Sequence, residues 1–105
     1  MTEPSKRLKM LETMIAKGSA DPFVYYARAL ELRGAGQAEQ ALQALTEVRE
    51  RFANYVPSYL AAGQLAIELG QTDQARDWLT AGIAVAKTEG DEHARSELQE
   101  ALDTL

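Results

Sequence analysis

The sequence of 105 residues contains no cysteine, one histidine, one tryptophan and three prolines. Without cysteine, the chain can form no disulfide bond and offers no thiolate metal ligand. With one histidine, a triad of nucleophile, histidine and acid would have to use His93. The absence of cysteine fits a reducing compartment, so we expect the protein in the cytoplasm.

Long apolar runs are also missing. No stretch approaches the roughly 18 uninterrupted apolar residues of a membrane-spanning helix. The N-terminal stretch MTEPSKRLKM has no apolar core and no small-residue cleavage site, so we predict neither a signal peptide nor a membrane partner. A composition with 46% hydrophobic and 26% charged residues is typical of a folded domain, and the length suits one domain over residues 1–105.

Basic residues are in the minority, with 11 Lys and Arg against 16 Asp and Glu and a net charge of −5. This balance argues against nucleic acid as a partner, because nucleic-acid binding depends on basic side chains that neutralise phosphates. Residues 1–20 carry four basic and two acidic side chains, whereas residues 88–105 carry six acidic and one basic. Two solvated helix faces explain this asymmetry most simply. Head-to-tail contacts between copies are the alternative.

Patterns typical of β-strands are absent, and helical periodicity dominates. Glycine and proline divide the chain into segments of about 12–16 residues, each long enough for three or four helical turns. Asp21 and Pro22 form a start signal, because Asp accepts hydrogen bonds from free N–H groups and Pro suits the first helical position. In the first segment one apolar stripe is expected from Leu8, Leu11, Met14 and Ile15. We predict six helices, at residues 5–17, 22–33, 38–51, 57–69, 72–87 and 91–104.

Two similar seven-residue segments lie 34 residues apart. They are GQAEQAL at residues 36–42 and GQTDQAR at residues 70–76. When residues 22–55 are aligned with residues 56–89, eight of 34 pairs are identical, where composition alone would give about three. The identical pairs are Tyr25/Tyr59, Ala27/Ala61, Gly36/Gly70, Gln37/Gln71, Gln40/Gln74, Ala41/Ala75, Leu45/Leu79 and Thr46/Thr80.

The repeated residues suit a pair of packed helices. The glycines fall where the chain must turn between two helices, and Ala41 and Ala75 are small enough for two backbones to approach closely. The same period places His93 in register with Tyr25 and Tyr59, so we expect His93 to be partly packed. We expect Trp78 to pack in the core or between helices rather than to form an exposed contact.

A period of 34 residues with two helices per unit resembles the tetratricopeptide repeat family. The pattern that carries the resemblance is a tyrosine, a small residue four positions later, an inter-helix glycine, an alanine and a leucine. The resemblance implies an all-α superhelix of about six antiparallel helices. It divides the chain into a capping helix at 5–17, repeats at 22–55 and 56–89, and a second capping helix at 91–105.

In this family the first helix of each unit lines the concave side of the array. The resemblance therefore implies a partner-binding groove lined by Phe23, Tyr26, Leu30, Arg33, Pro57, Leu60, Gln64 and Ile67. This set is mostly apolar, which suits a peptide or a partner helix. The favoured function is thus a non-catalytic protein–protein interaction module. The alternative is a self-assembling scaffold, a homodimer or head-to-tail stack, that uses the groove or the charged end helices.

Catalytic, metal and cofactor sites are not predicted. The acidic pairs Asp91–Glu92 and Glu97/Glu100 are expected on an exposed helix face, outside any pocket that could shift their pKa values. We therefore expect no enzymatic activity and no cofactor. One question stays open at this point: the last helix either leaves the groove free or folds against it.

Overall fold

The computed structural model describes residues 5–105; residues 1–4, including Glu3 of the N-terminal charge balance, lie outside the described part. The regular structure of residues 5–105 is entirely α-helical, which confirms the predicted all-α class. Each helix begins and ends within two residues of its predicted position. The helices are α1 (Lys6–Ala16), α2 (Pro22–Gly34), α3 (Ala38–Arg51), α4 (Pro57–Glu68), α5 (Thr72–Glu89) and α6 (Glu92–Asp103).

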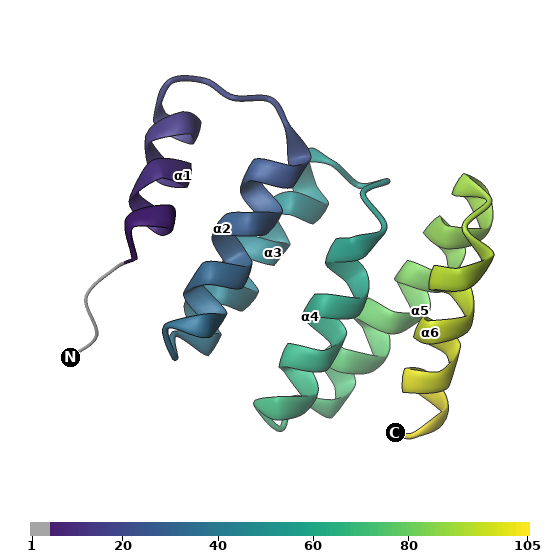
Figure 1. Cartoon of the computed structure of the whole chain (residues 1–105). Helices are drawn as coiled ribbons and strands as arrows, with labels where there is room; N and C mark the ends of the chain where they lie inside the picture. Colours follow the sequence, from purple (N-terminus) through teal and green to yellow (C-terminus); the bar gives the residue numbers. More distant parts are fainter. Residues whose placement is uncertain (1–4) are drawn as a thin grey trace.

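The helices form two layers of antiparallel neighbours (Figure 1). Helices α2, α4 and α6 form one layer, and α3 and α5 lie behind them. Helix α2 packs on α3, α4 packs on α5, and α4 also contacts α6 directly. Stacking allows each helix pair to bury an apolar face that it could not bury alone.

Local sequence signals explain the helix ends. Ser5 and Asp21 cap α1 and α2, because their side-chain oxygens accept backbone N–H groups of the first turn at 2.9 Å. Pro22 occupies the first position of α2, as predicted. Gly36 and Gly70 turn the chain between helices with φ angles of +80° and +72°, a conformation that strains other residues.

The repeated small and apolar residues form the core. Ala41 and Ala75 are both fully buried, which agrees with the predicted close approach of backbones. Leu45 and Leu79 lie beside them and are 1% and 0% exposed. Trp78 is also buried, so the prediction that it packs in the interior is confirmed.

Helix α1 buries less of its apolar face than its sequence predicts. Leu8 and Leu11 are buried and Ile15 is half-buried, but Met14 is 41% exposed. Met14 therefore belongs to the apolar stripe but lies outside its buried part. The reason is that α1 has α2 as its packing neighbour and is covered on a narrower face than a helix between two others.

Two equivalent tyrosines, in the first turns of α2 and α4, each form a hydrogen bond with the loop that precedes the helix. The hydroxyl of Tyr25 donates to the carbonyl of Ser19 at 3.0 Å, and the hydroxyl of Tyr59 donates to the equivalent carbonyl of Ala53. His93 occupies the same register in α6, but its side chain is 87% exposed, so the predicted partial packing is wrong. A shorter imidazole with two polar nitrogens cannot replace a ring that is buried at its base and satisfied at its tip.

Candidate functional site

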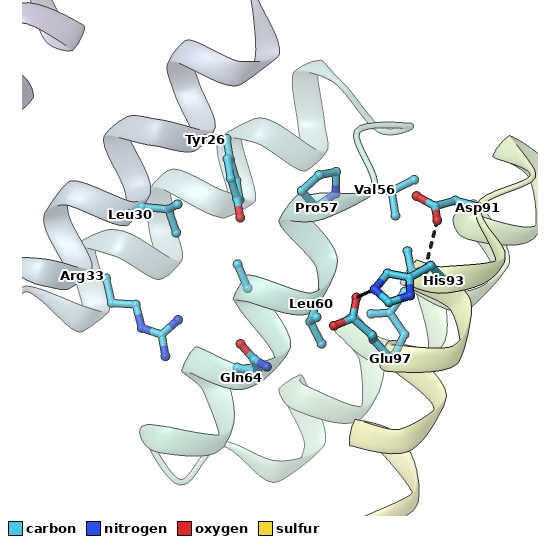
Figure 2. Close-up of a pocket in the computed structure, with 13 residues that line it drawn as sticks. Tyr26, Leu30, Arg33, Val56, Pro57, Leu60, Gln64, Asp91, His93 and Glu97 are labelled. Carbon is cyan, nitrogen blue, oxygen red and sulfur yellow. Dashed lines mark hydrogen bonds and ion pairs between the residues drawn. The ribbon is translucent and has the colours of Figure 1, made fainter.

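A groove of about 370 Å³ crosses α2, α4 and α6 (Figure 2). Helix α4 forms its floor, and α2 and α6 form its two walls. Six of the eight residues predicted to face a groove line it: Tyr26, Leu30, Arg33, Pro57, Leu60 and Gln64. Their contact with a partner stays a prediction.

The other two predicted residues lie outside this groove. Phe23 is 50% exposed and lines an adjoining depression of about 240 Å³ between α1 and α2, together with Leu30. Ile67 is 39% exposed on α4 but lines neither hollow. The apolar surface is therefore broader than the groove and extends toward α1.

Helix α6 supplies the wall that the sequence analysis missed. It answers the open question about the last helix, because α6 stands beside the groove and leaves Leu30 39% exposed. The period of 34 contained the signal, because three wall residues follow groove residues of α4 by that interval. These pairs are Pro57 and Asp91, Leu60 and Ala94, and Gln64 and Leu98.

The α2 wall of the groove carries one aromatic ring, that of Tyr26. Tyr55, which does not line the groove, packs edge to face on Tyr26, with centroids 5.5 Å apart and an interplanar angle of 61°. Burial raises the pKa of the Tyr26 hydroxyl, and the nearby charge of Arg33 opposes this rise. Tyr26 therefore stays protonated at neutral pH and presents a hydrogen-bond donor beside an apolar ring.

Charged groups lie at the edges of the groove. On the α2 side, the guanidinium of Arg33 forms an ion pair with the carboxylate of Glu68. On the α6 side, Asp91 Oδ1 accepts a backbone N–H of the first turn at 3.0 Å and caps the helix. One turn further, His93 Nε2 lies 3.3 Å from Glu97 Oε1 (Figure 2).

The four residues of the two predicted acidic pairs are exposed, as expected, and two of them, Asp91 and Glu97, also border the groove. One member of each pair lines the groove, whereas Glu92 and Glu100 do not. The reason is the direct contact between α6 and α4, which turns one face of α6 toward the groove.

Within residues 5–105 no group of three His, Asp or Glu side chains is placed to hold a metal ion. None of the described helices is both long enough and apolar enough to cross a bilayer. An accessible apolar floor with few charges at its edges can bind a short segment with large side chains.

Comparison with known proteins places the chain among helical repeat proteins. A family model described as tetratricopeptide repeat matches residues 32–102. A tetratricopeptide repeat domain protein from Salinibacter ruber is 39% identical to this chain. Its crystal structure has a TM-score of 0.75 and covers 80% of this chain and 93% of that chain. Its solution structure has a TM-score of 0.77 and covers 80% and 85%, respectively.

More distant solved structures share the fold. PcrH in complex with the chaperone-binding region of PopD is 18% identical, with a TM-score of 0.84, and covers 92% of this chain and 74% of that chain. A protein from Bordetella parapertussis is 24% identical, with a TM-score of 0.79 and coverage of 92% and 84%. Among curated proteins, none matches the sequence.

Proposed function

The chain belongs to the tetratricopeptide repeat family, and we propose that it is a protein-interaction module that holds a peptide or a partner helix in the groove of α2, α4 and α6. The observation that carries the proposal is the convergence of Tyr26, Leu30 and Leu60 on one open hollow. Large apolar side chains that stay accessible in a concave surface are typical of a binding site.

The architecture supports this proposal. Stacked helix pairs create extended concave surfaces, which repeat proteins use to bind partners. PcrH, which shares the fold, is solved with the chaperone-binding regions of PopD and PopB, so this fold can hold a segment of another protein. We expect the groove to bind without catalysis, because its one imidazole, His93, lies exposed at the edge beside Glu97.

Differential capture tests the proposal. Wild-type protein, Tyr26→Ala and Leu30→Glu are immobilised and exposed to the same lysate, and the retained proteins are compared by mass spectrometry. Met10→Glu is the matched control, because Met10 is 61% exposed on α1 and does not line the groove. We expect a specific protein to be retained by the wild type and Met10→Glu and lost from both groove variants. Equal retention by all four proteins would contradict the groove assignment.

Self-association is a second candidate function. The observation that favours it is the exposed apolar surface of α1, where Met10 and Met14 lie beside basic side chains, while α6 carries mostly acidic ones. Sedimentation at low and high salt tests this candidate. A charge-guided stack should grow at low salt and dissociate as salt screens the attraction. A monomer at high protein concentration and low salt excludes it.

A further inference from the structure

The charges around the groove are distributed unequally between its two walls. The α2 wall contributes Arg33, and the α6 wall contributes Asp91, His93 and Glu97. The Arg33 guanidinium forms an ion pair with Glu68, which offsets part of its positive charge. An incoming segment therefore meets one partly offset positive charge on one side and two carboxylates on the other.

The two carboxylates of the α6 wall keep capacity for a further partner. Asp91 uses Oδ1 to accept one backbone N–H, and its second oxygen makes no hydrogen bond within residues 5–105. Glu97 lies 3.3 Å from the imidazole of His93, which carries a full charge only when protonated. The neighbouring cation on α6, Arg95, is engaged by Glu92 at 3.0 Å. The negative charge of this wall is therefore only partly compensated.

Resting on the proposed function, we propose that the groove recognises a partner segment that carries a lysine or arginine close to large apolar side chains. The apolar side chains contact Tyr26, Leu30 and Leu60, and the basic group reaches the carboxylates of Asp91 and Glu97. Figure 2 shows these carboxylates on the far side of Leu60 from the α2 wall. Arginine would pair with a carboxylate in a fork, and lysine would act as a flexible point charge.

The same arrangement disfavours acidic ligands. A segment rich in Asp or Glu, or a terminal carboxylate, would bring negative charge against the α6 wall, where like charges repel. Arg33 offers only partial compensation, because it is a single charge that already pairs with Glu68. The net charge of −5 adds a long-range attraction for basic segments at low salt.

The geometry also sets the spacing within the partner. Because the apolar floor and the acidic wall lie on adjacent helices, anchor and basic residue should be close in sequence. In a helical segment they would be about three or four residues apart, and in an extended segment about two. This spacing distinguishes recognition in the groove from a general attraction to basic chains.

A selected peptide panel tests the inference. A random peptide library is displayed against the full chain, and enriched peptides are synthesised with fluorescein and measured by anisotropy. The variants are Asp91→Asn, which keeps an N-cap residue, and Glu97→Gln, which keeps the length of the side chain. Glu100→Gln is the matched control, because it removes the same charge from the same helix but does not line the groove.

We expect the enriched peptides to combine apolar residues with a lysine or arginine at the stated spacing. Each groove variant should weaken binding about two- to fivefold and the double variant about tenfold, as expected for partly exposed ion pairs. The control should bind like the wild type. With Glu97→Lys, the preference should move toward peptides in which glutamate replaces the basic residue.

Other outcomes separate the inference from the proposed function. Peptides that lose affinity with Leu30→Glu but show no preference for lysine or arginine overturn the inference and leave the proposed function standing. An equal loss of affinity with Glu100→Gln and Glu97→Gln also overturns the inference, because the peptides would then respond to the overall charge of α6 and not to the groove. A panel without any peptide sensitive to Leu30→Glu overturns the proposed function itself.

Discussion

The two helix pairs α2–α3 and α4–α5 adopt the same arrangement but fill their interiors differently. Helix α3 places Ala44 and Val48 at two positions one turn apart, and α5 places Trp78 and Gly82 at the equivalent positions. All four residues are buried. The larger side chain therefore stands at the second position in α3, as Val48, and at the first position in α5, as Trp78, one helical turn apart on the same face.

This exchange has a consequence for the groove. A Cβ atom on Gly82 would lie 2.6 Å from Tyr59 Cβ and 3.0 Å from a methyl carbon of Leu98. Only glycine allows these side chains to pack so closely, and Leu98 belongs to α6. The glycine of the second pair thus helps to hold α6 against α4, where it forms one wall of the groove.

The largest expected effect comes from Trp78→Ala, which introduces at this position of α5 the alanine that α3 has at Ala44. The Trp78 ring lies edge-on to Tyr59, with centroids 5.8 Å apart, and the guanidinium of Arg49 lies 4.9 Å from the Trp78 ring centroid. Loss of these contacts in a buried site should lower the free energy of unfolding by about 4 kcal/mol. Urea unfolding followed by circular dichroism measures the change. A loss below about 1 kcal/mol would show that the site collapses around the alanine.

Gly82→Val should have the next largest effect. It introduces the valine that α3 has at Val48, but at position 82 the side chains of Tyr59 and Leu98 leave no space for it. The backbone atoms of Tyr59 and Gly82 would have to separate, and such overpacking lowers stability by about 2–3 kcal/mol. Gly34→Ala is the control, since a Cβ atom there meets nothing within 4 Å. Urea unfolding of both variants is the measurement. Equal stability of Gly82→Val and Gly34→Ala would contradict the proposed role of close packing.

A smaller effect is expected when the tyrosine hydroxyl is removed. Tyr25→Phe and Tyr59→Phe each leave the carbonyl of Ser19 or Ala53 without its donor and should lower the free energy of unfolding by about 1 kcal/mol. His93→Ala should change stability by less than about 0.5 kcal/mol, because the side chain is exposed. Thermal and urea unfolding of the three variants give the comparison. A large loss for His93→Ala would show that the third member of the series is also structural.

The sequence predicts the scaffold well because the scaffold depends on local rules. The period of 34, the turn glycines and the caps at Asp21 and Pro22 give the helices and their order before any contact is known. The α2 and α4 sides of the groove follow from the resemblance to the family, in which the first helix of each unit lines the concave side. These features repeat, and a repeated feature can be recognised within one sequence.

The features that were not predicted depend on contacts that differ from one repeat to the next. His93 keeps the register of Tyr25 and Tyr59 but lies exposed, and Met14 keeps the period of its helix but remains exposed. The α6 wall was missed because the register was continued from Tyr59 to His93 but not for the groove positions, such as Leu60 to Ala94. Within the charged edge, Asp91 follows Pro57 by the same interval, whereas Glu97 does not follow a groove residue and borders the groove through the packing of α6 on α4.

The last prediction is a small gain in stability, and it again compares the two pairs. Ser58 replaces Val24 of the first pair, is fully buried, and its hydroxyl has no hydrogen-bond partner within residues 5–105. Ser58→Ala removes this unsatisfied group and should raise the free energy of unfolding by about 0.5–1 kcal/mol. Ser96→Ala, at an exposed position of α6, reports the gain from helix propensity alone. Urea unfolding of both variants is the measurement. If Ser58→Ala gains no more stability than Ser96→Ala, the buried hydroxyl of Ser58 has a hydrogen-bond partner such as an ordered water, and the second pair carries no unsatisfied group at this position.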